Sequence, residues 1–225
     1  MPELHVLSVF LGPNGRGGNP LGVFLEGAAV PAPLRQQVAA DLGFSETVFV
    51  DDAASGGLRI FTPATELPLA GHPLVGTSWL LARLGRPVDV LRPPAGEVPT
   101  WQAGEMTWIR GRPEWAPDFA LQQLASPADV DAHPGAGPDE LLEIWSWDDE
   151  SRGQVRARVF PTVVGVAEDE ATGSAALRLA AALGRSLRIR QGVGSVIEAR
   201  PYDDGTVAVG GETALVETRD HPLPS

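Results

Sequence analysis

Apolar residues recur with a helical period in two segments of the chain, Leu74–Leu84 and Ala175–Leu183. In each segment they fall three and four positions apart, which predicts a helix with one buried face. Each helix follows a strand that begins Arg-aliphatic-Phe, at Arg59–Phe61 and at Arg158–Phe160, and each ends in Leu-Gly-Arg. A predicted hairpin with a turn at a glycine comes next in both cases. This self-similarity indicates two related halves.

The starts of the two helices carry matching polar steps, Gly71-His72 and Gly173-Ser174. A helix start leaves backbone N–H groups unpaired and carries a partial positive charge, so both steps could hold a carboxylate. Two such starts facing each other across a cleft predict a site for a small anion between the halves. Asp169 lies just before the second helix start and would sit at the rim of this site. Alternatively, the acidic residues there only cap the helix and complement its dipole.

The repeated pattern predicts an α+β fold of two pseudo-equivalent lobes, each a curved β-sheet wrapped around a central helix. We place the N-terminal lobe at residues 1–109, a C-terminal lobe at 110–216 and a tail at 217–225. Alternation and turn residues predict further elements. These are strands at Leu4–Phe10, Asn19–Leu25, Phe44–Val50, Leu58–Phe61, Val88–Leu91, Leu141–Trp147 and Gln154–Phe160, hairpins around 96–109 and 194–209, a helix at Leu34–Leu42 and a short helix near Phe119–Leu124.

Composition narrows the possible partners and the location of the protein. The net charge of −12 argues against nucleic acid or an anionic membrane as a partner. No segment approaches the roughly 20 apolar residues of a membrane span. The first nine residues lack a basic region followed by an apolar core, so no signal peptide is predicted and the cytoplasm is the expected location.

Missing residue types exclude several kinds of chemistry. The chain has no Cys, and all 17 of its basic residues are Arg. Thiolate catalysis, disulfides, Schiff bases and a phosphate-binding lysine are therefore excluded. His5, His133 and His221 lack metal-ligand spacing, so no metal is expected. The glycine-rich runs 12–18 and 192–194 match no complete nucleotide-binding fingerprint, so we interpret the first as a loop and infer no cofactor.

Four ordered motifs resemble those of the phenazine-biosynthesis isomerase-like (PhzF-like) family. They are Asn19–Val23, Phe44–Val50, Phe61–Pro73 and Glu168–Ala175, and with the hairpins they span nearly the whole chain. The resemblance implies a diaminopimelate epimerase-like fold with the active site between two lobes. It also implies a possible homodimer, since members of the family are commonly homodimers. Trp115, Trp145 and Trp147 would then either cover an interface or fill the core.

The resemblance also implies roles for individual residues. The glutamate that shuttles a proton between two carbons of trans-2,3-dihydro-3-hydroxyanthranilate in the isomerase falls on Glu46. Its histidine and aspartate fall on His72 and Asp169, which would bind polar groups of the substrate or stabilise developing charge. Gly71, Gly173 and Ser174 would donate hydrogen bonds to the carboxylate of a small-molecule substrate. The implied enzyme is a cofactor-independent isomerase or epimerase that works by acid–base catalysis.

Two departures from the family pattern support an alternative. Ser8 stands where members usually carry Asp, and the stretch from Arg112 to Val155 is several tens of residues shorter than usual, which makes the chain a shortened member. The alternative is a small-molecule binding or regulatory protein that kept the cleft and lost turnover. Taken singly, Glu46 could also be a helix-dipole or salt-bridge residue, His72 a helix N-cap or a neutral core histidine, and Asp169 only a helix cap.

Overall fold

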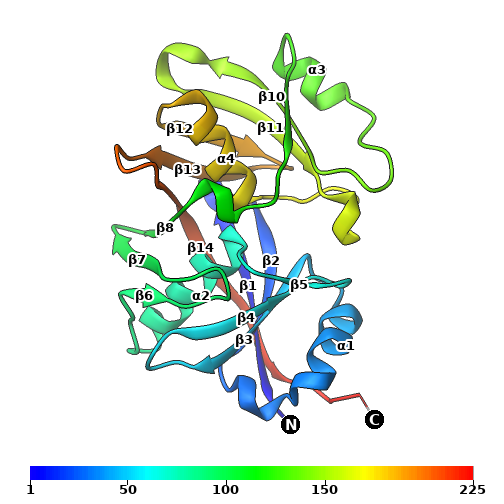
Figure 1. Cartoon of the computed structure of the whole chain (residues 1–225), viewed down its shortest axis with the longest axis vertical. Coiled ribbons are helices and arrows are strands. Elements are labelled where there is room, and N and C mark those ends of the chain that lie inside the picture. The colour runs from blue at the N-terminus through cyan, green and yellow to red at the C-terminus, as the bar shows by residue number, and fades with distance from the viewer. Residues whose placement is uncertain (225) are drawn as a thin grey trace.

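A computed structural model describes residues 1–224 of the chain. Its strands form one large, curved and mostly antiparallel sheet, whose main path runs in the order β5-β4-β3-β2-β1-β14-β13-β12-β11-β10-β9. Figure 1 shows the molecule as an upper and a lower half, each with one helix packed inside the curved sheet. The long strands β1 (Glu3–Leu11) and β14 (Val207–Asp220) pair with each other, and β14 continues from one half into the other.

The lower half contains the N-terminal elements. Its strands are β1, β2 (Gly17–Phe24), β3 (Glu46–Asp52), β4 (Gly57–Phe61), β5 (Glu66–Leu67), β6 (Val90–Leu91), β7 (Val98–Ala103) and β8 (Met106–Gly111). Helix α2 (Gly71–Arg83) packs against β1, β8 and β14, while α1 (Ala32–Leu42) lies outside the sheet. Gly43 ends α1 in the left-handed conformation, as the sequence predicts.

The upper half contains β9 (Ala120–Gln123), α3 (Pro127–Ala132), β10 (Leu142–Asp149), β11 (Gln154–Phe160), α4 (Gly173–Leu183), β12 (Leu187–Gln191) and β13 (Ser195–Pro201). Helix α4 packs against β13 and β14.

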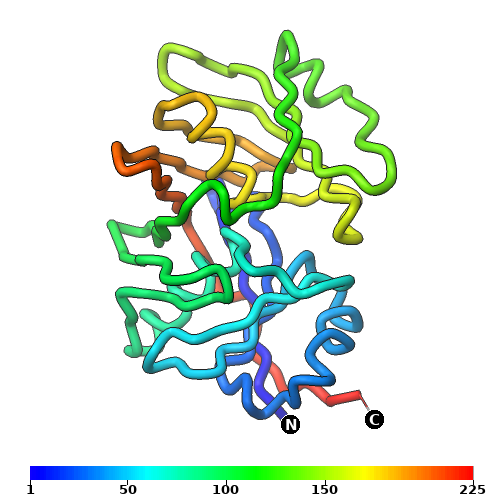
Figure 2. The backbone as a smooth tube through the Cα atoms, viewed as in Figure 1, coloured from blue at the N-terminus to red at the C-terminus, as the bar shows by residue number. Residues whose placement is uncertain are grey.

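Five single turns of 3-10 helix connect elements within residues 1–224: η1 (Pro13–Gly15), η2 (Gly27–Ala29), η3 (Pro113–Trp115), η4 (Glu150–Arg152) and η5 (Thr162–Val164). The tube in Figure 2 shows that the chain ends near where it begins, at the bottom of the lower half.

The two predicted central helices are buried, which confirms the α+β fold class. Every residue of α2 from Gly71 to Ser78 is buried, and so is α4 from Gly173 to Leu177. One apolar cluster joins the two halves, because it contains side chains of both helices and of strands from both, including Ile60, Leu74, Leu177 and Ile189. A shared core of this kind holds the halves in one arrangement.

Several element predictions need correction. Residues 120–123 form the strand β9 and not a helix, because they pair in parallel with β10. Strand β12 was not predicted. The proposed lobe boundary after Ile109 falls inside β8, and the proposed tail from residue 217 includes the last four residues of β14. The division into two lobes itself stays a prediction.

The positions of three tryptophans and the lengths of the helices bear on the predicted dimer and on contact with a membrane. Trp145 is buried, and Trp147 and Trp115 pack partly buried against the same core, so these side chains contribute to the interior. Whether the protein forms a homodimer stays a prediction. No helix within residues 1–224 is long and apolar enough to cross a membrane.

Candidate active site

The starts of α2 and α4 meet at the centre of the molecule, between the two halves. Gly71 and Gly173 are in reciprocal contact: a Cβ atom on Gly71 would lie 2.6 Å from Cα of Gly173, and one on Gly173 would lie 2.9 Å from Cα of Gly71. Real Cβ atoms do not approach other atoms this closely, so both positions require glycine. The two glycines therefore let the positive ends of two helices approach each other.

The unpaired backbone N–H groups at the start of α2 and of α4 have no capping side chain. No side chain caps α2 or α4, and neither has an acidic residue in its first turn. Two uncapped helix starts in contact create a region of positive potential that favours an anion nearby. The acidic residues of the site, Glu46 and Asp169, lie on neighbouring segments.

Glu46 is the first residue of β3 and comes from the lower half. Its side chain is 13% exposed, and its Oε2 atom lies 3.4 Å from Nε2 of His72, with no hydrogen-bond partner for either atom. Burial, reinforced by the negative charge of Asp169, raises the pKa of Glu46 to about 8. Glu46 is thus a carboxyl group that can hold or release a proton near neutral pH.

Asp169 comes from the upper half, where it bridges Val159 of β11. Both of its carboxylate oxygens accept hydrogen bonds, Oδ1 from the amide of Asn19 at 2.7 Å and Oδ2 from the hydroxyl of Thr172 at 2.7 Å. Burial raises the pKa of Asp169 to about 6, and these two hydrogen bonds oppose the rise. Asp169 therefore loses its proton more easily than Glu46 and is held more firmly.

His72 lies in the first turn of α2 and is 2% exposed. Burial lowers the pKa of His72 to about 3, so the ring is neutral at physiological pH. Its contact with Glu46 consequently joins two neutral groups below about pH 8 and is not an ion pair. A neutral imidazole can exchange hydrogen-bond roles with the carboxyl group beside it.

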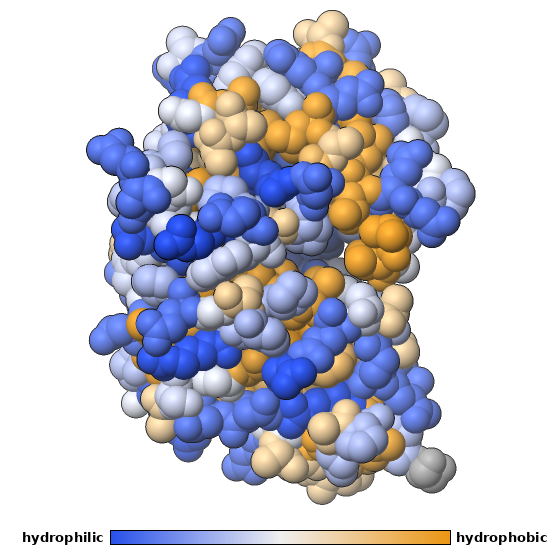
Figure 3. Space-filling view, in the orientation of Figure 1, coloured by the Kyte–Doolittle hydropathy of each residue, from blue (hydrophilic) through white to orange (hydrophobic). Residues whose placement is uncertain are grey.

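A small enclosed cavity of about 30 Å³ lies between the halves and joins these residues. Its polar wall is formed by Ser45, Glu46, Asp169, Thr172 and Ser174, and its apolar wall includes Leu67, Phe119 and Leu141. An adjoining open cleft of about 370 Å³ shares Ser45, Val166 and Asp169 with the cavity. Figure 3 shows the surface hollowed between the upper and lower halves.

The structure brings most of the predicted site residues together. Glu46, Asp169 and Ser174 line the cavity, and His72 lies behind Glu46. Gly71 and Gly173 do not line it, since their contact lies within the packed junction of the helices. The structure thus places all six predicted residues at one junction, with three of them on the cavity wall.

Sequence reasoning missed three polar residues that hold Asp169 in place. Asn19 accepts a hydrogen bond from Ser45 and donates to Asp169 and to the carbonyl of Ala171. Gln191 is 1% exposed, donates to the carbonyl of Asp169 and to the hydroxyl of Thr172, and accepts from the backbone N–H of Thr172. Asn19 and Thr172 lie inside the family motifs, a signal that could have found them, whereas Gln191 has no sequence signal.

The fold and the site define an α+β protein in which acidic groups from both halves face one cavity. Residues 10–111 match the model of the family described as "Phenazine biosynthesis-like protein". The trans-2,3-dihydro-3-hydroxyanthranilate isomerase of Pseudomonas fluorescens is 31% identical over an alignment that covers 78% of this chain and 77% of the isomerase. The chain belongs to the phenazine biosynthesis-like (PhzC-PhzF) family.

Solved structures agree in fold. A PhzC/PhzF protein from Clostridium difficile superposes with a TM-score of 0.79 at 19% identity, covering 99% of this chain and 100% of its own. A hydroxyproline epimerase from Agrobacterium vitis, solved with bound trans-4-hydroxy-L-proline, superposes with a TM-score of 0.63 at 12% identity over 97% of this chain and 91% of its own. The architecture is therefore similar to that of both PhzF proteins and epimerases.

Proposed function

We propose that this protein is a cofactor-independent isomerase or epimerase of a small metabolite that carries a carboxylate. Relatives named as isomerases and epimerases of the same fold support this reaction class. The start of α4, whose Ser174 lines the cavity, would receive the carboxylate of the substrate through hydrogen-bond donors, and the uncapped start of α2 beside it would add positive potential. The apolar wall of the cavity would pack against the body of the substrate.

One observation carries the assignment of the catalytic proton to Glu46. Both acidic side chains are buried, but only Asp169 has each oxygen hydrogen-bonded, while Oε2 of Glu46 is unpartnered. A proton shuttle needs a carboxyl group whose proton is not already committed and whose pKa lies near the working pH. Glu46 meets both requirements, and Asp169 is better suited to bind the substrate and to hold the negative charge that keeps the pKa of Glu46 high.

In the proposed mechanism, the carboxylate of Glu46 removes a proton from one carbon of the bound substrate. The electrons of that C–H bond move into the conjugated system or carboxylate next to it, and Glu46 returns the proton to another carbon on the same face of the substrate. His72, which is neutral, would hydrogen-bond to Glu46 and keep its carboxyl group oriented. No change in redox state is needed.

The decisive experiment is deuterium exchange between solvent and substrate. The protein is incubated in D₂O with trans-2,3-dihydro-3-hydroxyanthranilate and with a panel of small carboxylates, and deuterium in the recovered compounds is measured by mass spectrometry. Glu46→Gln should reduce the exchange at least about 100-fold while preserving ligand binding, because an amide cannot carry the proton. The matched control is Glu97→Gln, an exposed glutamate outside the cavity, which should exchange at the wild-type rate.

The pH dependence provides a second test of the same residue. Proton removal requires the ionised form of Glu46, so the rate of exchange should rise with pH as the solution passes through about pH 8. Wild-type rates in Glu46→Gln would remove Glu46 from the mechanism. A wild type that binds carboxylates and exchanges none of them would support the alternative, a binding or regulatory protein of this fold.

A further inference from the structure

The two glycine-rich segments that matched no nucleotide fingerprint pack against each other on the surface. The first, residues 12–18, comprises the loop between β1 and β2 and the first two residues of β2, and the second, residues 192–194, forms the turn between β12 and β13. The backbone N–H of Gly18 donates to the hydroxyl of Ser195 at 2.7 Å, and Gly12 abuts the carbonyl of Gly194. The two segments therefore form one continuous wall.

This wall borders a groove of about 520 Å³ that is separate from the candidate active site and shares no lining residue with it. The strands β10 to β13 supply the rest of its lining. Val193, which is 79% exposed, and the half-buried Val196 provide apolar surface, while Arg16, Arg188, Arg190 and Asp148 are the charged residues of the lining. The groove thus combines an apolar surface with a mainly positive border.

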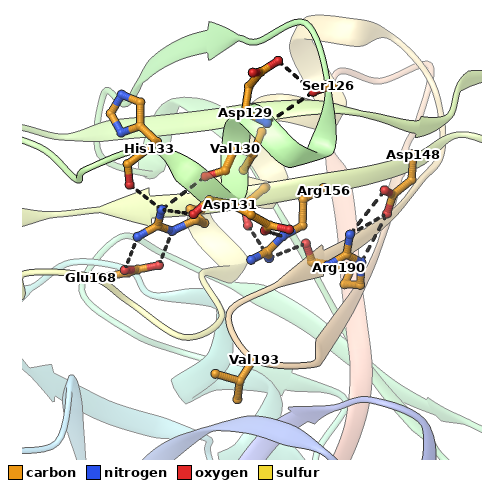
Figure 4. Close-up of polar contacts among 12 residues, drawn as sticks. Ser126, Asp129, Val130, Asp131, His133, Asp148, Arg156, Glu168, Arg190 and Val193 are labelled. Carbon is orange, nitrogen blue, oxygen red and sulfur yellow. Dashed lines mark hydrogen bonds and ion pairs between the residues drawn. The ribbon is translucent and has the colours of Figure 1, made fainter.

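The charges of the groove do not cancel. Arg190 pairs with Asp148 at 3.2 Å, as Figure 4 shows, and Arg188 pairs with Glu198. Arg16 is exposed and has no ion pair with any residue between 1 and 224. One uncompensated positive charge therefore faces the groove in a protein whose net charge is −12.

From these features we propose that the groove is a second binding site, for a monoanionic organic molecule with an apolar body, such as an aryl carboxylate. The carboxylate would pair with Arg16, since that cation has no ion-pair partner among residues 1–224, and the apolar body would cover Val193 and Val196. A neutral molecule would leave Arg16 unpaired, and a dianion would exceed the single free charge. The single unpaired charge at the border of the groove therefore favours a monoanion as the ligand.

The groove is connected to the candidate active site through Glu170, which follows Asp169 in the chain. The carboxylate of Glu170 accepts hydrogen bonds from the backbone N–H of Val193 at 3.0 Å and from the hydroxyl of Ser195 at 2.7 Å. Val193 also lines the groove, and Asn19, which binds Asp169, follows Gly18. A ligand in the groove would therefore contact the turn that holds Glu170.

The test is calorimetric titration of the full chain with 2-naphthoate. We expect saturable binding of one molecule per chain. Arg16→Gln should weaken this binding about 10-fold, equivalent to about 1.4 kcal/mol, because it removes a charge-assisted hydrogen bond. Val193→Asp, which adds a negative charge at the border of the groove, should weaken it in the same way. The neutral analogue 2-naphthalenemethanol should bind the wild type about as weakly as 2-naphthoate binds Arg16→Gln.

Two control variants separate this site from others. Arg86→Gln removes an exposed arginine that does not line the groove, and Leu67→Trp would fill the cavity of the candidate active site; both should bind 2-naphthoate with wild-type affinity. Absence of saturable binding to the wild type would overturn the proposal. Binding that survives Arg16→Gln and Val193→Asp but is lost in Leu67→Trp would also overturn it, because the ligand would then occupy the active site. Neither result depends on whether the protein has isomerase activity.

Discussion

The two halves of the molecule use the same scaffold to hold the segment that leads into the central helix. In the lower half, Arg59 of β4 pairs with Glu66, five residues before Gly71. In the upper half, Arg158 of β11 forms two hydrogen bonds with Glu168, five residues before Gly173, at 2.7 and 2.8 Å. The residues that follow these glutamates, Leu67 and Asp169, bridge equivalent strand positions.

The chemistry is divided unequally over this shared scaffold. Asp169 of the upper half corresponds to Leu67 of the lower half, and the strand registers make Glu46 of the lower half correspond to Leu141 of the upper half. All four side chains line the same cavity. Each half thus contributes one acid and one leucine, at positions that do not correspond. The comparison teaches that repeated elements form the cavity, while its two carboxyl groups stand at positions where the repeat is broken.

The largest expected effect concerns the contact that both halves share. Gly71→Ala or Gly173→Ala would force a methyl group into the backbone of the other helix, so each should destabilise the protein by about 3 kcal/mol. Urea unfolding measures this. Gly111→Ala is the control, since its new methyl group would find the nearest atoms at 3.8 Å and should change stability by less than about 0.5 kcal/mol. Equal stability of all three variants would contradict the helix contact.

The next effect separates the two Arg–Glu pairs. The side chain of Arg158 is 15% exposed and also donates hydrogen bonds to three backbone carbonyls at the end of α3. These belong to Val130, Asp131 and His133, the residues labelled in Figure 4. The side chain of Arg59 is 47% exposed and bonds only Glu66. Arg158→Gln should therefore cost about 2 kcal/mol of stability and Arg59→Gln about 0.5 kcal/mol. Equal losses on urea unfolding would mean that the extra contacts of Arg158 contribute nothing.

The smallest effect concerns a buried acid that only the upper half carries. Glu143 of β10, 1% exposed, corresponds by register to Val48, and burial raises its pKa to about 8. An acid whose pKa is higher in the folded state than in the unfolded chain favours folding at low pH and loses that advantage as the pH rises through about 8. The wild type should therefore lose stability between pH 5 and pH 9 relative to Glu143→Gln.

The expected difference is at least about 1.4 kcal/mol, the equivalent of one pKa unit. It is obtained from urea unfolding of both proteins at the two pH values. Parallel pH profiles for wild type and Glu143→Gln would show that Glu143 does not titrate in the folded protein over this range. Comparison with the variant is needed because Glu46 also has a raised pKa.

Local sequence signals predicted the parts of the fold in which the two halves repeat each other. The Arg-aliphatic-Phe strands, the glycine at each helix start and the apolar periodicity of Leu74–Leu84 are local features, and the structure has each of them. The conformation of residues 120–123 could not be predicted from local signals. They are all exposed and have no alternating pattern, and only their pairing with β10 makes them a strand.

The candidate site followed the same division. Glu46, His72 and Asp169 lie in contiguous motifs and could be found from the sequence. Gln191 could not, because it reaches Thr172 and Asp169 from β12, about twenty residues away in the chain. The pairing of acids and leucines across the cavity was equally hidden, since it depends on strand register.

The reciprocal contact of Gly71 and Gly173 implies an approximate twofold axis that relates the two helix starts. A residue close to such an axis meets its own counterpart. A ligand held only by the helix starts would therefore have two equivalent orientations, related by a half turn. Glu46 and Asp169 remove that equivalence, because neither has an acidic counterpart across the axis. The cavity consequently lacks the twofold symmetry of the helix starts, and a bound molecule would present one defined face to Glu46.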